Sequence, residues 1–241
     1  MLASLLTECA KLRRSLVLLL CLSAPAMVAL IGLLALTRDD RTGTWALFSV
    51  SSSAVWAYFM LPMTVTALTV LAAQLEHGAK SWNHLLALPL PRYRLYGAKA
   101  AVVVLLAAAM TAGLWLALPL AGSAAEALKS GTQLTGSYGW ADSATLLGRM
   151  FASAWLLIAI QLWAALRFRS FVPPLILGIA GTFVGVAATG SEHGIWFPWL
   201  IPTNALASDP ARADFALSVG FFGGIAAFAL MLWDLNRREH G

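Results

Sequence analysis

The residues best suited to chemistry are concentrated in one internal stretch, EHGAKSWNHLLALPLPRYRLYGAKA, at residues 76–100. Its two histidines, His77 and His84, are seven residues apart, or about two helical turns, which is a poor spacing for one shared metal ion. No CxxC or Cys/His metal-binding spacing occurs in the chain. The remaining charged and aromatic residues of the stretch are Glu76, Lys80, Trp82, Arg92, Tyr93, Arg94, Tyr96 and Lys99. This mixture favours contact with a partner over catalysis.

The composition around this stretch indicates an integral membrane protein. Of 241 residues, 60% are hydrophobic and 11% are charged, whereas a soluble domain has roughly 45–50% apolar and about 25% charged residues. The net charge of +5 comes from basic residues that flank apolar runs, as in membrane proteins. The first apolar run continues to about Leu36, which is too long for a signal peptide, so we expect a retained first span.

Six segments are long and apolar enough to cross a bilayer as helices. They are residues 16–37, 47–74, 100–121, 146–166, 172–190 and 214–233. Residues 2–15 have leucines at helical spacing opposite charged residues, which predicts a helix lying along the membrane interface, with a simple cytosolic tail as the alternative. We therefore predict an all-α integral membrane protein with one transmembrane domain over residues 1–241.

The distribution of Lys and Arg favours cytosolic termini. With the N-terminus inside, eleven of the sixteen basic residues are cytosolic and five are external, as the positive-inside rule requires. The cytosolic ones are Lys11, Arg13, Arg14, Lys80, Arg92, Arg94, Lys99, Arg167, Arg169, Arg237 and Arg238. The stretch at 76–100 is then the only long cytosolic loop, and residues 122–145 and 190–213 form the larger external loops.

The predicted spans contain almost no ionisable residue at mid-depth, where Gln161 and scattered Ser and Thr are the polar groups. Ion-coupled carriers generally need such ionisable residues, so their absence argues against an ion-driven carrier. No HExxH or GxSxG motif indicates an intramembrane enzyme, and no GxxxxGK[ST] loop is present to bind nucleotide. The chain is therefore not predicted to be an enzyme and is expected to carry no cofactor or metal.

Glycines and aromatic residues mark two further features. Gly178, Gly181 and Gly185 line the fifth predicted span, and Gly220 and Gly224 line the sixth. Such spacing permits close helix packing, either within the chain or across a dimer. Residues 190–213 are too apolar for a free loop, so they are expected either to lie at the outer interface or to re-enter the membrane under a protein cover.

The internal stretch has the pattern of an amphipathic helix over residues 74–88, which must end before Pro89 and Pro91. A turn or short helix over residues 92–98 then leads into the third span. A protruding cytosolic element of this kind suits docking of a soluble partner. The alternative is a helix that lies on the membrane surface with its Lys and Arg side chains extended to water.

These motifs resemble those of a known family. Glu76, Trp82 and LLALPLPRYRLYGAK at 85–99 resemble the sequence that follows the second span in ABC-2-type permeases, most closely the lantibiotic-immunity and bacitracin-resistance group. Residues 8–15 before the first span and PWLIPTNAL at 198–206 resemble the same group. The resemblance covers nearly the whole chain.

The resemblance implies a type V ABC exporter-like fold, with a cytosolic coupling helix between spans two and three. It also implies two copies of a separate ATPase, a second permease chain, and a multi-pass location in the bacterial cytoplasmic membrane. The residues that would receive the ATPase's motion are Glu76, Lys80, Trp82, Leu85, Leu86, Pro89, Arg92, Tyr96 and Lys99. ATP would be bound by the partner subunit and not by this chain.

Three functions compete at this stage. The first is the permease subunit of an ATP-driven exporter for a hydrophobic or amphipathic substrate, such as an antimicrobial peptide, a drug or a lipid-like molecule. The second is a membrane anchor or sensor that recruits a cytosolic partner through residues 76–99. The third is an intramembrane enzyme or ion-coupled carrier. A neighbouring gene for a Walker-motif ATPase would favour the first.

Overall fold

The computed structural model describes residues 16–38, 42–77, 92–129 and 133–237. The predicted interfacial helix at 2–15 and most of the predicted coupling helix lie outside these ranges. The principal elements are α2 (Leu16–Arg38), β1 (Thr42–Thr44), α3 (Trp45–Val55), α4 (Leu61–His77), α6 (Arg92–Leu128), β2 (Gln133–Thr135), α7 (Trp140–Ser153), α8 (Trp155–Arg167), α9 (Val172–Ala187) and α10 (Pro210–Arg237). Five described helices are long and apolar enough to cross a bilayer, or six if the bent pair α7–α8 forms one span.

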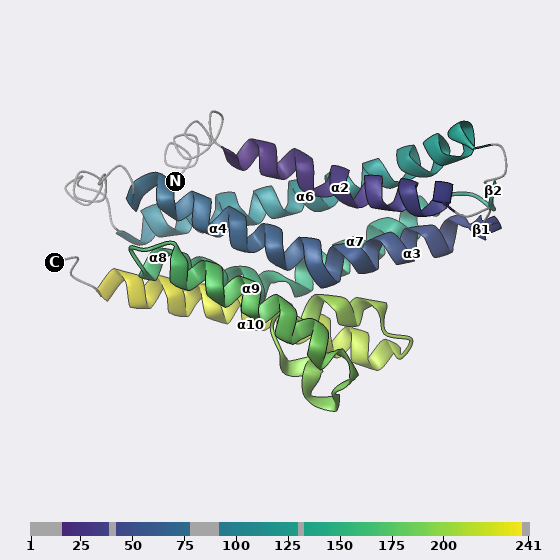
Figure 1. The fold of residues 1–241 in the computed structure, drawn as a ribbon. Coiled ribbons are helices and arrows are strands. Elements are labelled where there is room, and N and C mark those ends of the chain that lie inside the picture. The colour runs from purple at the N-terminus through teal and green to yellow at the C-terminus, as the bar shows by residue number, and fades with distance from the viewer. Residues whose placement is uncertain (1–15, 39–41, 78–91, 130–132, 238–241) are drawn as a thin grey trace.

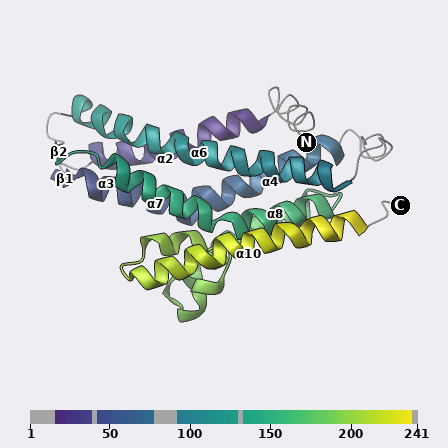
Figure 2. The same cartoon turned by 180° about the vertical axis from the view of Figure 1, so that it is seen from behind.

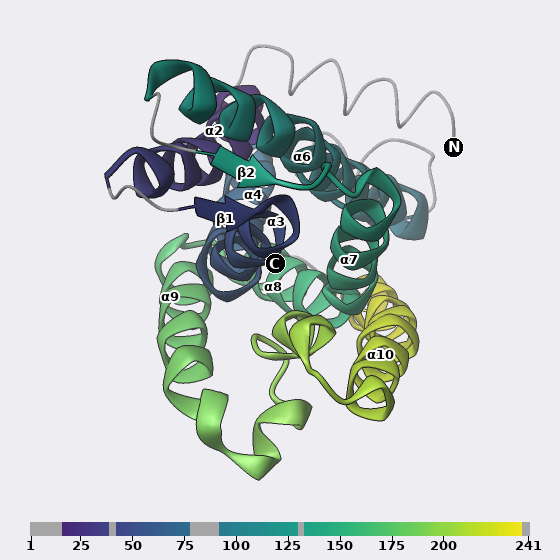
Figure 3. The ribbon, with the colours of Figure 1, turned by 90° about the vertical axis from the view of Figure 1, so that its right-hand side faces the viewer.

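The helices run side by side along one direction, and their ends alternate (Figures 1 and 2). The start of α2, the end of α4, the start of α6, the α8–α9 connection and the end of α10 lie together at one end, which we call the α4–α6 end. The strands β1 and β2 lie at the other end, which we call the β end (Figure 3). The helices formed by the apolar runs thus lie side by side, with about a fifth to a half of each candidate span buried inside the bundle.

Helix α6 is longer than the sequence predicted. The expected span covered residues 100–121 after a separate turn at 92–98, but one 37-residue helix runs from Arg92 to Leu128. It continues through Pro119, so this proline does not end it. The expected external loop at 122–145 is correspondingly shorter, because residues up to 128 belong to α6 and α7 begins at Trp140. The structure therefore corrects both predictions.

The fourth predicted span, 146–166, is a longer and bent helix pair. Helices α7 and α8 meet at Ala154 with a 41° bend. On the facing surface of α10, a Cβ at Gly220 would overlap the backbone of Ser153, and one at Gly224 would overlap Trp155. The absence of these two side chains lets α10 lie against the backbone of the bend.

The second span contains one π-helical turn, η1 (Trp56–Met60), between α3 and α4. Its position follows from Pro62, since proline has no N–H to donate to the carbonyl of Tyr58 four residues earlier. The amide of Leu61 instead donates to the Trp56 carbonyl, which is the i→i+5 pattern of a π-turn. Insertion of the wider turn rotates Tyr58 out of the regular helical register.

The connections at the β end are more ordered than loops of this composition suggest. Strands β1 and β2 pair in parallel, with Gly43 opposite Leu134, a small sheet that the all-α prediction did not include. The segment after α9 folds as three short 3₁₀ helices, Ala188–Gly190, Glu192–Trp196 and Ile201–Leu206. Within it Trp199, Leu200 and Ile201 are buried against protein, the condition under which irregular backbone is tolerated at membrane depth.

Candidate functional site

The coupling segment, residues 76–99, joins α4 to α6 at the α4–α6 end. Lys80, Trp82, Leu85, Leu86 and Pro89 lie outside the described residues. Within the segment, Glu76 belongs to the last turn of α4 and Arg92 begins α6. These two residues therefore lie on different helices. Tyr96 and Lys99 are the predicted coupling residues whose side chains are described.

Tyr96 and Lys99 are buried side chains in the first turns of α6. Tyr96 is 1% exposed and Lys99 is 4% exposed. The Lys99 ammonium donates to the carbonyl oxygen of Ala72 at 3.0 Å, which joins the first turns of α6 to the end of α4. Sequence analysis placed Lys99 in a cytosolic loop, and its burial was missed because the helical continuity of residues 92–100 was missed.

Other polar contacts fix the neighbouring helices at this end. The Gln74 amide donates to the carbonyl oxygen of Arg169 at 3.5 Å, linking α4 to the α8–α9 connection. The indole N–H of Trp163 donates to the carboxylate of Asp234 at 2.9 Å, linking α8 to α10. The coupling segment therefore emerges from a set of helix ends that are bound to one another.

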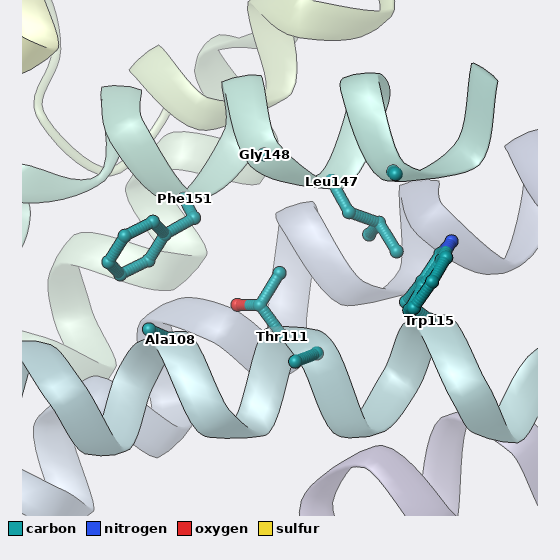
Figure 4. Close-up of a pocket in the computed structure, with 8 residues that line it drawn as sticks. Ala108, Thr111, Trp115, Leu147, Gly148 and Phe151 are labelled. Atoms are coloured by element: carbon teal, nitrogen blue, oxygen red, sulfur yellow. The ribbon is translucent and has the colours of Figure 1, made fainter. Parts of the chain in front are cut away.

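A second candidate site is the α6–α7 groove, a cavity of about 220 Å³ (Figure 4). It is lined by Ala108, Thr111, Ala112, Trp115, Ala144, Leu147, Gly148 and Phe151. The small residues leave the space open, and a Cβ added at Gly148 would meet no atom within 4 Å. Leu147 and Phe151 project from α7 toward α6, where Thr111 and Trp115 lie (Figure 4).

The chemistry of the α6–α7 groove is apolar. Thr111 is its only hydroxyl-bearing residue, and that hydroxyl donates to the Ala107 carbonyl of its own helix at 2.9 Å. Toward the β end, the Trp115 indole donates to the Trp140 carbonyl oxygen at 3.1 Å, and the two rings meet edge to face. Aromatic residues of this kind are typical of the membrane–water boundary. The groove can hold an apolar group but offers no charge to bind a polar one.

A third candidate, which we call the polar pocket, lies on the other side of the bundle. It has a volume of about 370 Å³, and its polar lining consists of Tyr58, Thr189, Thr203, Asn204, Ser208, Asp209 and Arg212. These residues come from η1, from the 3₁₀ segments after α9, and from the start of α10. Although Tyr58 is central in the second span by sequence, it lines the same pocket as Arg212 at the start of α10. Helix α3 extends beyond α9 toward the β end (Figure 1).

Asn204 holds the polar pocket together. It is 5% exposed; its amide nitrogen donates to the Leu200 carbonyl oxygen at 2.9 Å, and its amide oxygen accepts from Arg212 Nε at 2.8 Å. Sequence analysis did not single out Tyr58, Asn204 or Arg212. Two features of the sequence could have indicated this site. One is Pro62, which lies next to the π-turn, and the other is Arg212, the basic residue that follows the PWLIPTNAL segment.

The five glycines proposed for helix packing all face neighbours within the chain. A Cβ at Gly178 would overlap Thr66 of α4, and one at Gly181 would overlap the ring of Trp199. One at Gly185 would touch Trp199 and Phe197 at 3.4 Å and 3.6 Å. Gly220 and Gly224 face the α7–α8 bend, as described above. Within the described residues, these positions are thus occupied by intramolecular contacts.

No group of three or more His, Cys, Asp or Glu side chains in the described ranges is arranged to hold a metal ion. A comparison with protein families matches residues 4–185 to the model described as "ABC-2 family transporter protein". No curated protein and no solved structure matches the chain.

Proposed function

The chain belongs to the ABC-2 family of transporter proteins, and on this premise we propose that it is the membrane permease subunit of an ATP-driven exporter. The observation that carries the proposal is the family match over most of the chain. The five or six helices able to span a membrane agree with it. The family implies an ABC-type ATPase as partner. We further propose two ATPase copies and a second permease chain, identical or different, to complete the complex.

The energy source is proposed to lie in the partner. The sequence contains no GxxxxGK[ST] loop, whose backbone amides and lysine cradle nucleotide phosphates. A separate ATPase would therefore bind ATP, and its movements would have to reach the membrane helices mechanically. This requires a contact surface on the permease and a stiff element behind that surface.

The coupling segment is proposed as that contact surface. It would present the predicted residues Glu76, Lys80, Trp82, Leu85, Leu86, Pro89 and Arg92 to the ATPase. Tyr96 and Lys99, which are buried, would instead anchor the start of α6 to α4. Because α6 is continuous from Arg92 to Leu128, a displacement at its first turn would be carried along the whole helix, including the wall of the α6–α7 groove.

We propose that the α4–α6 end faces the cytosol of a bacterium and that both termini are cytosolic. The alternation of helix ends supports this orientation, because eleven of the sixteen Lys and Arg residues then fall on one side. The substrate is proposed to be hydrophobic or amphipathic, as in a peptide, drug or lipid-like molecule of the lantibiotic or bacitracin class. The apolar lining of the α6–α7 groove supports that class.

The test is co-expression with a cognate ABC ATPase, sought first among the neighbouring genes, followed by purification and reconstitution into liposomes. The pair is expected to co-purify and to hydrolyse ATP, whereas the permease alone should not. Replacing the Walker lysine of the ATPase should abolish hydrolysis without loss of binding. Co-purification with no transport and no stimulation of hydrolysis by any apolar substrate would favour the anchor or sensor role instead.

A further inference from the structure

The polar pocket plays no part in the proposed coupling to an ATPase, yet it contains an arginine held in a fixed position. Arg212 is partly buried, and its Nε donates to the amide oxygen of Asn204. Since Asn204 is itself held by the Leu200 carbonyl, the guanidinium is oriented through one of its five N–H groups. Its terminal N–H groups remain for a ligand.

The nearest carboxylates do not neutralise Arg212. Asp209 accepts a hydrogen bond from the amide of Ala211 at 3.0 Å, at the start of α10. Asp214 forms an ion pair with Arg149 of α7. Within the described residues no ion pair is formed by Arg212. Asp209 also lines the pocket, but its Oδ1 accepts from the Ala211 amide. A partly buried cation that is hydrogen-bonded but forms no ion pair can bind an anion through its remaining N–H groups.

Tyr58 of the π-turn η1 supplies a second donor to the lining of the pocket. Its hydroxyl forms no hydrogen bond with any described residue. π-turns inside helices are frequently found at functional sites, and here a phenol O–H and the Arg212 guanidinium line one pocket. An acceptor-rich group could bond to both.

The surroundings indicate where such a group comes from. Trp196 and Phe215 are 61% and 39% exposed, and their rings meet edge to face with centroids 4.9 Å apart. Phe215 lies only three residues after Arg212 in α10. Exposed aromatic pairs are typical of the membrane–water boundary. We therefore infer that the start of α10, which also lines the pocket, lies at the depth of lipid headgroups. The pocket has a volume of roughly 370 Å³, which is large enough for a phosphate group.

From these observations we propose that the polar pocket is a binding site for a phosphate group, carried by an anionic lipid headgroup at the β end. Arg212 supplies the charge, Tyr58 a second hydrogen bond, and Asn204 the orientation of Arg212. The apolar part of the lining, Leu200, Leu206 and Ala207, suits the first carbons of the lipid's acyl chains. The site does not depend on which way the chain is inserted.

The test is a titration of the purified full-length chain in non-ionic detergent with labelled phosphatidylglycerol, with diacylglycerol as the ligand that lacks phosphate. Arg212→Gln is expected to weaken phosphatidylglycerol binding about tenfold or more, since hydrogen bonds to charged groups are among the stronger ones. Arg212→Lys, which keeps the charge but not the planar fork, should give an intermediate loss. Tyr58→Phe should weaken binding about threefold, as expected for one neutral hydrogen bond.

The matched control is Arg149→Gln, which removes the same charge near the same end but from an ion pair outside the pocket. It should leave phosphatidylglycerol binding unchanged. Equal thermal unfolding midpoints for Arg212→Gln, Arg149→Gln and wild type would show that loss of binding is not loss of fold.

Inorganic phosphate distinguishes the two sources of the same chemistry. Displacement of phosphatidylglycerol by millimolar phosphate in the wild type, with phosphate binding lost in Arg212→Gln, would assign the site to a soluble phosphate. Resistance to displacement would assign it to the lipid. Equal phosphatidylglycerol binding by wild type and Arg212→Gln, or equal affinity for diacylglycerol, would overturn the proposal.

Discussion

The coupling segment and the polar pocket are built in opposite ways. The coupling segment is contiguous, since its charged and aromatic residues follow one another over residues 76–99. The polar pocket is assembled from Asn204 and Arg212, which are eight residues apart, and from Tyr58, which is distant in sequence. Tyr58 joins the other two only because α10 and the 3₁₀ segments pack near η1. A contiguous segment keeps its residues together when helix packing is disturbed, whereas an assembled site does not. This difference can be tested by mutations that affect one region and spare the other.

The largest effect is expected where α10 meets the α7–α8 bend. A Cβ at Gly220 would overlap the backbone of Ser153, and a backbone neighbour cannot rotate away as a side chain can. Gly220→Ala should therefore lower the free energy of unfolding by about 3 kcal/mol, at the upper end of typical overpacking costs. Thermal unfolding of the purified chain measures this.

The control is Gly223→Ala on the same helix, where the nearest atom is a Leu156 methyl at 3.6 Å. It should change stability by less than about 0.5 kcal/mol. If the two regions differ as argued, Gly220→Ala should also weaken phosphatidylglycerol binding at the polar pocket while the ATPase is still bound. Loss of both activities to the same degree would mean that the coupling segment depends on the same packing.

The second effect concerns the coupling segment alone. Trp82→Ala should cost at least about 2 kcal/mol of ATPase binding, because buried aromatic anchors commonly dominate interfaces, and this is roughly a thirtyfold loss of affinity. The polar pocket should be unaffected. The measurement is pull-down of the ATPase by wild type and variant at equal membrane expression. Equal recovery with unchanged transport would mean that the segment only lies on the membrane surface.

The two regions also differ in how far sequence could predict them. The spans followed from apolar runs, and the family resemblance that rested on residues 76–99 is confirmed at the level of the ABC-2 family. Residues 92–98 were predicted as a turn or short helix before the third span, whereas they begin one continuous helix. The burial of Tyr96 and Lys99, and the hydrogen bond of Lys99 to α4, were not predicted.

The polar pocket was not predictable from local pattern. Tyr58 has the sequence context of an ordinary span residue, and only the missing N–H of Pro62 explains why the helix widens there. Asn204 and Arg212 become a pair only when the chain folds back after α9. The bend at Ala154 was missed as well, since no Gly or Pro lies at the bend itself, and the glycines that lie against it, Gly220 and Gly224, belong to α10.

A smaller effect is expected at Lys99, which tests whether its role is to join helices rather than to meet a partner. Lys99→Met keeps the apolar stem but removes the hydrogen bond to the Ala72 carbonyl. The cost should be about 1 kcal/mol, because the lost charged hydrogen bond is partly offset by no longer burying a charge. Exposed Arg94→Met should cost nothing measurable by thermal unfolding. If ATPase binding falls while stability is unchanged, Lys99 contacts the partner directly.

The smallest effect is expected at the β end, where Ser49 of α3 and Ser143 of α7 share a hydrogen bond of 2.8 Å between their hydroxyl oxygens. Both side chains are buried. A double-mutant cycle of Ser49→Ala and Ser143→Ala isolates this pair, and its coupling energy should be about 0.6 kcal/mol, the average for hydrogen bonds between membrane helices. The control is Ser51→Ala with Ser143→Ala, because Ser51 is exposed and donates to the Leu47 carbonyl of its own helix at 2.7 Å. Its coupling to Ser143 should be zero.

The same pair also connects α3 to the polar pocket. The Ser49–Ser143 hydrogen bond joins the part of α3 that precedes η1 to α7, the helix that bends against α10. Ser49→Ala should therefore slightly weaken phosphatidylglycerol binding at the polar pocket and leave ATPase pull-down unchanged. Zero coupling between Ser49 and Ser143 would show that apolar packing alone holds α3 against α7.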